Sequence, residues 1–170
     1  PTAPQFKADE DRGGLADAWA EGAGAEAGLS AYVHVPYCRS RCLYCGCHTE
    51  VLRPADDEQL DAYVGTLLRE IELLDGLLGG GRGPLRQLAL GGGTPTILDR
   101  ASMARLLDGL TGAWPPAEGA ELSVEVDPRT IDTALLDDLL QRGFNRVSLG
   151  VQDLDPDVQA IIARVQPRAM

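Results

Sequence analysis

The four cysteines of this chain lie within ten positions, in the order Cys38-x3-Cys42-x2-Cys45-x-Cys47. Such closely spaced thiols can bind iron or zinc, or pair as disulfides. Disulfides are rare in reducing compartments, and nothing in the sequence resembles a secretion signal. Zinc stays open, although structural zinc sites usually take two ligand pairs that lie apart in the sequence. Three thiolates on one tight loop fit three irons of a [4Fe–4S] cluster and leave the fourth iron for a ligand that is not protein.

Two further stretches could contact a ligand. Gly92 and Gly93 stand in "GGGTP", directly after an apolar run, where glycines let the backbone approach a ligand and Thr94 offers a polar contact. A tight turn is the structural alternative for these glycines. Glu125 lies on the polar face of a later run, where it needs a ligand or an ion-pair partner, and Arg146 on the next run is the candidate partner.

These residues are positioned by a predicted alternation of strands and helices. Apolar-alternating runs predict strands at 30–35, 85–90, 121–127 and 146–152. Helical patterns occupy 57–78, 101–112 and 131–142, and another helix begins after Asp153 or Asp155, with Pro156 at its first position. Strands that alternate with helices in this way predict βα units and a parallel sheet.

One face of the predicted sheet is polar. A sheet covered by helices on both faces would read as continuous branched apolar residues. Here apolar side chains alternate with polar ones, which predicts a barrel or partial barrel whose helices cover the apolar face around a wet lumen. The expected apolar face carries Val33, Val35, Leu122, Val124, Val126, Val147, Leu149 and Val151, and the expected lumen face carries Tyr32, His34, Ser123, Glu125, Asp127, Arg146, Ser148, Gly150 and Gln152.

Composition narrows the class of protein. With 44% hydrophobic residues the chain can bury a core, and no apolar run is long enough to cross a bilayer. A formal charge of -11 argues against a nucleic-acid surface. We expect a cytoplasmic protein with an N-terminal arm at 1–28 and one barrel domain at 29–170. We also expect the chain to be a fragment, because it begins at Pro1 without an initiator methionine and ends at Met170, a few residues into an apparent helix.

Four stretches together resemble a known family. Cys-x3-Cys-x2-Cys after a first strand is similar to the radical S-adenosylmethionine (SAM) superfamily. "YVHVPYCRSRCLYCGC", "LALGGGTPTIL", "SVEVDPRTID" and "GFNRVSLGVQD", in this order, resemble the oxygen-independent coproporphyrinogen III oxidases of heme biosynthesis. The resemblance implies an α/β fold, a partial (β/α)6 TIM-like barrel of the radical SAM type, of which about four βα units are present here.

The resemblance also implies roles for individual residues. Cys38, Cys42 and Cys45 match the ligands of a [4Fe–4S] cluster, and Cys47 matches an extra cysteine on the substrate side. The positions that match contacts to two SAM molecules are Tyr32, Tyr44, Gly92, Gly93, Thr94 and Glu125 for the first, and Gln152 and Arg164 for the second. By itself Arg164 would be a solvated helix arginine, and it follows Ala163, where some family members carry Asn.

The activity implied by the resemblance is the decarboxylation of two propionates of coproporphyrinogen III to vinyl groups, giving protoporphyrinogen IX. An electron donor such as flavodoxin or ferredoxin, a monomeric state and an inactive isolated fragment are further expectations. Arg129 and Arg164 could dock substrate carboxylates. A radical SAM methyltransferase and a heme chaperone are the alternatives. "Cys45-Gly46-Cys47" favours the oxidases, since the chaperone branch typically lacks that last cysteine.

Overall fold

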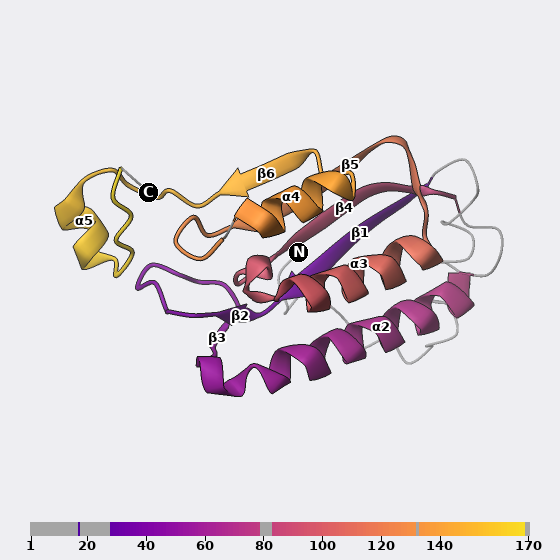
Figure 1. Cartoon of the computed structure of the whole chain (residues 1–170), viewed down its shortest axis with the longest axis horizontal. Helices are drawn as coiled ribbons and strands as arrows, with labels where there is room; N and C mark the ends of the chain where they lie inside the picture. The colour runs from indigo at the N-terminus through magenta and orange to yellow at the C-terminus, as the bar shows by residue number, and fades with distance from the viewer. Residues whose placement is uncertain (1–16, 18–27, 79–82, 132, 169–170) are drawn as a thin grey trace.

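A four-stranded parallel sheet forms the centre of the chain (Figure 1), seen in a computed structural model that describes residues 17, 28–78, 83–131 and 133–168. The strands lie in the order β1 (Leu29–Val35), β4 (Leu85–Gly92), β5 (Pro116–Val126) and β6 (Arg146–Leu149). Nearly all of the expected arm at 1–28 falls outside the described residues. The parallel pairing confirms the predicted sheet, although β6 ends three residues before the predicted boundary at 152.

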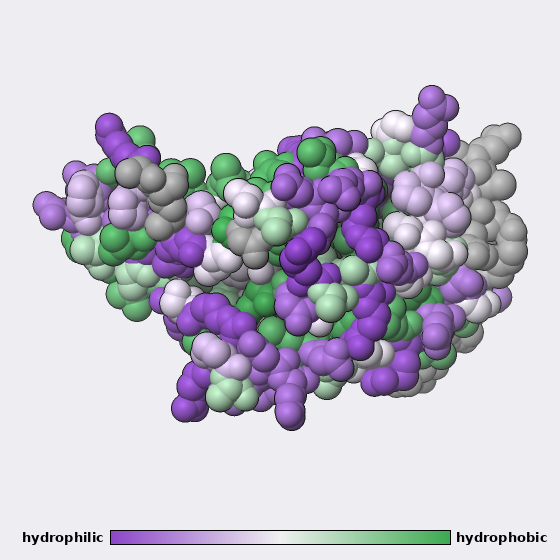
Figure 2. Space-filling model, in the orientation of Figure 1, coloured by the Kyte–Doolittle hydropathy of each residue, from purple (hydrophilic) through white to green (hydrophobic). Residues whose placement is uncertain are grey.

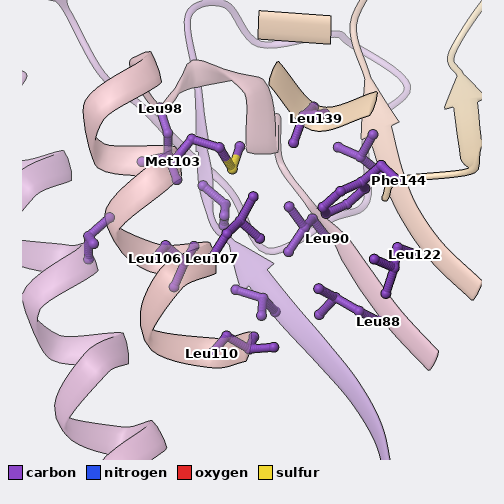
Figure 3. Close-up of a cluster of buried hydrophobic side chains, with 14 of the residues drawn as sticks. Leu88, Leu90, Leu98, Met103, Leu106, Leu107, Leu110, Leu122, Leu139 and Phe144 are labelled. Carbon is purple, nitrogen blue, oxygen red and sulfur yellow. The ribbon is translucent and has the colours of Figure 1, made fainter. Parts of the chain in front are cut away.

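Three helices connect the strands and share one hydrophobic core with them. They are α2 (Glu58–Leu78), α3 (Arg100–Ala113) and α4 (Thr133–Gln141). Figure 3 shows leucines of α3 on one side of the cluster and Leu88, Leu90 and Leu122 of the sheet on the other, with Leu139 of α4 at the top. Each of these side chains is at most 3% exposed, and burying one contributes about 1.5–3 kcal/mol. The helices therefore cover the apolar face, as predicted.

The opposite face of β1 and β5 is polar, which agrees with the predicted lumen. Tyr32 and Glu125 are exposed, whereas Val33 and Val124, their neighbours along the strands, are buried. The register also fixes cross-strand neighbours, because Glu125 of β5 lies opposite Ser148 of β6. Functional side chains on this face are thus left open to a ligand.

The last strand differs from the prediction. Val147 and Leu149 were expected under a helix, but they are 49% and 57% exposed. The reason is the position of α5 (Pro156–Ile161), which lies beyond the strand ends and not over the sheet (Figure 1). Figure 2 shows hydrophobic surface along the edge formed by α4 and β6. Within the described residues β6 pairs only with β5, so its other edge offers free backbone groups.

The end of α5 corrects a second expectation. Asp155 caps the helix as predicted, since its carboxylate accepts bonds from the amides of Asp157 and Val158. The helix ends at Ile161, and Ala163 adopts a left-handed conformation at φ 54°. Arg164 is therefore not a helix residue, and it is buried instead of solvated. Asn is enriched in this conformation, which gives a physical reason for the Asn that some members of the resembling family carry there.

Candidate metal and cofactor site

The cysteine loop is fastened at both ends. A short parallel pairing of β2 (Tyr37–Cys38) with β3 (Glu50–Val51), not predicted from the sequence, closes residues 39–49 into a loop. The amide of Leu43 in this loop donates to the carbonyl of Ile162 at 2.9 Å, which ties it to the segment after α5. All four cysteines are free thiols. The loop thus holds its thiols close to the carboxyl ends of the strands, where sites of barrel enzymes lie.

A cavity of about 360 Å³ lies between this loop and the strand ends. It brings together every predicted site residue except one. Its lining includes Cys38, Cys42, Tyr44, Cys45, Cys47, Gly92, Gly93, Thr94, Glu125, Gln152 and Arg164. A larger cavity of about 510 Å³ lies beside β1, α2 and α3, but its lining is mainly apolar and contains no cysteine. The donor groups place the candidate site in the smaller cavity.

Tyr32 is the predicted residue that does not line the site cavity. It borders the larger cavity, and its hydroxyl lies 3.3 Å from Nδ1 of His34. Partial burial, followed by the charges of Glu125 and Cys47, raises the pKa of Tyr32 above its ordinary value. Tyr32 therefore stands next to the site, on the lumen face of β1 and close to Glu125.

The glycine turn is needed by the chain itself. Gly92 has φ 110°, and a Cβ there would lie 2.8 Å from the ring of His34. A Cβ at Gly93 would lie 2.7 Å from the carbonyl oxygen of Tyr37 and 3.0 Å from Sγ of Cys38. The hydroxyl of Thr94 donates to the same sulfur at 3.4 Å. The tight turn and the ligand contact are therefore compatible interpretations of this motif, because the turn brings its backbone against Cys38.

Glu125 does not pair with Arg146, so that expectation was wrong. Its Oε2 accepts a hydrogen bond from the amide of Gly92 at 3.3 Å, and Arg146 instead forms an ion pair with Glu121 at 3.0 Å. Arg146 lies opposite Ser123 of β5, so Glu121 and Glu125 are each two residues from the position that it faces. Arg146 pairs with Glu121, the glutamate nearer the amino end of β5, and Glu125 lines the cavity.

Gln152 and Arg164 meet on the far side of the cavity. The guanidinium of Arg164 donates to the carbonyl of Gly150 at 2.8 and 3.2 Å, and a Cβ at Gly150 would lie only 2.9 Å from it. Gln152 has φ 65°, which is uncommon for a residue with a side chain. The side-chain nitrogen of Gln152 lies next to the guanidinium of Arg164, since both are within 3.2 Å of a Cβ placed at Gly150.

The sequence did not predict that Asp127, Arg129 and Arg164 form one charged group at the site. Asp127 accepts hydrogen bonds from Arg129, the shortest at 2.6 Å, and lies 3.2 Å from Arg164. Both arginines also donate to Sγ of Cys42, at 3.7 Å from Arg129 and 3.4 Å from Arg164. The signal available in the sequence was "EVDPR", two opposite charges directly after a strand, whose partner across the fold is not visible in the sequence.

Two thiols of the site, those of Cys38 and Cys47, have a pKa raised above the ordinary value for cysteine. Burial raises the pKa of the Cys38 thiol, the Thr94 hydroxyl partly offsets this, and the charges of Cys45 and Cys42 raise it further. A hydrogen bond with Cys45, and its charge, raise the pKa of Cys47. Because metal ligands must be thiolates, binding here requires positive charge and releases protons.

The donor set fits an iron–sulfur cluster better than a single metal ion. In the part of the chain that the structure describes, no three Cys, His, Asp or Glu side chains are grouped so that they could hold one metal ion. Mononuclear zinc needs such a group, whereas a four-iron cluster offers a separate iron to each thiolate. Three free cysteines around one cavity, with a fourth beside them, therefore fit the cluster.

Comparison with known proteins decides the family. Residues 32–169 match the family described as "Radical SAM superfamily". The chain belongs to the radical SAM superfamily. Membership implies a [4Fe–4S] cluster and SAM, and the cysteine loop and glycine turn of this radical SAM chain are suited to them. Among the described helices, none is long and apolar enough to cross a membrane.

Relatives of this radical SAM chain carry a common name. It is 45% identical to an oxygen-independent coproporphyrinogen III oxidase of Paracoccus denitrificans and 41% identical to one of Escherichia coli, each over 98% of this chain. It spans only 36% and 35% of those proteins. A solved structure titled "Coproporphyrinogen III oxidase (HemN) from Escherichia coli is a Radical SAM enzyme" matches with a TM-score of 0.87 at 39% identity, covering 98% of this chain and 37% of that one. The expected resemblance and fold are confirmed.

Proposed function

We propose that the protein containing this chain is an oxygen-independent coproporphyrinogen III oxidase, which converts two propionate side chains of coproporphyrinogen III to vinyl groups. The observation that carries the proposal is the single cavity that joins the cysteine loop, the glycine turn, Glu125, Gln152 and Arg164. These residues come from stretches that resemble the oxidases, and the relatives in two organisms bear that name.

In this proposal three thiolates hold the cluster. Cys38, Cys42 and Cys45 would hold the cluster, and SAM would be its ligand that is not protein. When bound, the reduced cluster supplies the electron that cleaves SAM and starts radical chemistry on the substrate. The protein's contribution is to bind, orient and exclude water. The fastening of the loop to Ile162 supports this, because a fixed loop holds the three thiols in place relative to the strand ends.

In this proposal, two SAM molecules bind to separate sets of residues. Tyr32, Tyr44, Gly92, Gly93, Thr94 and Glu125 serve the first, and Gln152 and Arg164 serve the second. The partition is supported by geometry, since Glu125 accepts from the amide of Gly92 on one side and Gln152 stands next to Arg164 on the other. Cys47 is exposed and is hydrogen-bonded to Cys45, a position suited to the substrate side.

The remaining features of the proposal concern the whole protein. Residues 29–170 form the first part of the barrel domain, preceded by an arm at 1–28. The protein is a cytoplasmic monomer that receives electrons from a donor such as flavodoxin or ferredoxin. Its net charge of -11 is unsuited to nucleic acid.

The test of the function is an anaerobic assay of the full-length parent with SAM, a reductant and coproporphyrinogen III. We expect protoporphyrinogen IX and carbon dioxide, with methionine and 5′-deoxyadenosine as products of SAM. The 170-residue chain alone should give none, because it spans about a third of its relatives. Methylated product would point to a methyltransferase, and heme transfer without turnover to a chaperone.

We predict that Glu125→Ala weakens SAM binding about tenfold or more in the full-length protein. A lost hydrogen bond to a charged group is worth about 1.5–3 kcal/mol, and each 1.4 kcal/mol is a tenfold change in affinity. Equilibrium binding of SAM to the reconstituted protein measures the effect. Glu121→Ala is the matched control, since that carboxylate lies four residues earlier on β5, pairs with Arg146 and should leave SAM affinity unchanged. Normal SAM binding with a lower unfolding temperature would make Glu125 a structural residue.

A further inference from the structure

Cys42 differs from the other cysteines in its surroundings. It is the one of the four that is buried, at 8% exposure. Two guanidinium groups donate to its sulfur, from Arg164 at 3.4 Å and from Arg129 at 3.7 Å. Among the described hydrogen bonds, the corresponding donor to Cys38 is the neutral hydroxyl of Thr94. The charged donors of the site are therefore concentrated on one of the three proposed ligands.

Asp127 holds the two arginines in this arrangement. Its carboxylate takes bonds from Nε and Nη2 of Arg129 and an ion pair from Arg164. The side chains of Asp127, Arg129 and Arg164 are 8%, 18% and 9% exposed, so the group is shielded from water. One carboxylate and two guanidiniums leave a net charge of +1 next to Cys42.

Arg129 is consequently not available as a free docking group for substrate carboxylates. Three of its described bonds go to Asp127 through the side chain, and a fourth goes to Cys42. Its backbone amide also donates to Asp127 at 3.0 Å, which fixes the turn after β5. Arg129 is thus held at its backbone and at its guanidinium. Such a side chain is suited to positioning a bound group, because it loses little conformational freedom when that group binds.

Such a cation has a defined effect on a cluster. Hydrogen bonds to the sulfurs and local charge set the reduction potential of an iron–sulfur centre. Reduction adds an electron, so a guanidinium next to the ligand thiolate stabilises the reduced form more than the oxidised form. Burial strengthens the effect, because charge interactions are screened less away from water.

We propose that Arg129 is a positioning residue for the cluster, which, held by Asp127, donates to the Cys42 thiolate and raises the reduction potential of the centre. The inference rests on the proposed function only through the assignment of Cys42 as a ligand. Decarboxylation plays no part in its test, so the identity of the substrate does not affect the outcome.

The experiment is an anaerobic redox titration of the reconstituted full-length protein, followed by electron paramagnetic resonance. For Arg129→Gln we expect the equilibrium constant for one-electron reduction to fall about tenfold, which corresponds to about 59 mV. The iron–thiolate stretching frequencies in the resonance Raman spectrum should change as well, since a bond to sulfur is lost. Arg142→Gln is the matched control, because it breaks an arginine–aspartate pair with Asp108 away from the cavity and should change neither quantity.

Arg129→Lys keeps the charge without the planar fork and should give a smaller shift in the same direction. If Arg129→Gln assembles no cluster, the reduction potential of Arg129→Lys provides the test. A normal cluster content with wild-type potential and Raman spectrum in these variants would overturn the inference. Full iron content in Cys42→Ser would instead refute the ligand assignment on which it rests.

Discussion

Replacing Cys38, Cys42 or Cys45 with Ser is expected to abolish the brown chromophore of the anaerobically reconstituted protein, together with its bound iron and sulfide. Cys47→Ser should leave all three largely intact. The reason is that a serine hydroxyl is a poor ligand for iron–sulfur clusters, which are held by thiolates. Iron and sulfide analysis with the visible absorption spectrum measures the effect, and the expected loss is nearly complete.

Cys47 is the built-in control of this series. It lies on the same loop, lines the same cavity and is more exposed than the three proposed ligands. A general effect of losing a thiol from the loop would therefore appear in Cys47→Ser too. If that variant lost iron as completely as Cys42→Ser, the division into three ligands and one free cysteine would be wrong. Bound zinc without sulfide in the wild-type protein would revive the zinc alternative.

Asp127→Asn is expected to lower the free energy of unfolding by about 3 kcal/mol at neutral pH, since breaking a buried ion pair leaves charge without its partner. Burial alone would raise the pKa of Asp127, but hydrogen bonds from Arg129 and the charges of Arg164 and Arg129 outweigh it and lower the pKa. The stabilisation is thus fully present above the unfolded pKa of about 3.9 and is lost as the pH falls through the folded value. Urea unfolding of the apo-protein measures it.

The pH dependence of the unfolding free energy tests the direction of the pKa shift at Asp127. The difference between wild type and Asp127→Asn should stay constant from pH 7 down to about pH 5 and narrow below about pH 4. Asp108→Asn is the control, because its pair with Arg142 is at the surface and is worth at most about 1 kcal/mol. A loss at Asp127 no larger than that of the control would mean that the carboxylate does not hold the two arginines together.

The sequence by itself determined the elements that carry the candidate site, and it indicated a metal centre held by thiolates. The spacing of Cys38, Cys42 and Cys45 is a local property, and it indicated three ligands on one loop without knowledge of distant residues. The period-2 alternation around Val124 and Glu125 distinguished a covered face from an open one, because alternate strand residues face opposite sides. Asp155 and Pro156 likewise marked the start of α5 through local backbone chemistry.

Only the tertiary structure decided which charges meet. Arg146 had two glutamates within reach along β5 and pairs with Glu121, which alternation could not determine because both lie on the same face. Arg164 follows a helix that leaves the sheet, and the left-handed Ala163 directs it back to Asp127 and Cys42. The position of α5 also explains why Val147 and Leu149 are exposed. The helix ends next to the cysteine loop and does not cover β6. The pattern of a strand or helix shows which side of the element is apolar. The partner of a charged side chain depends instead on which strand ends lie side by side, and that is a property of the assembled sheet.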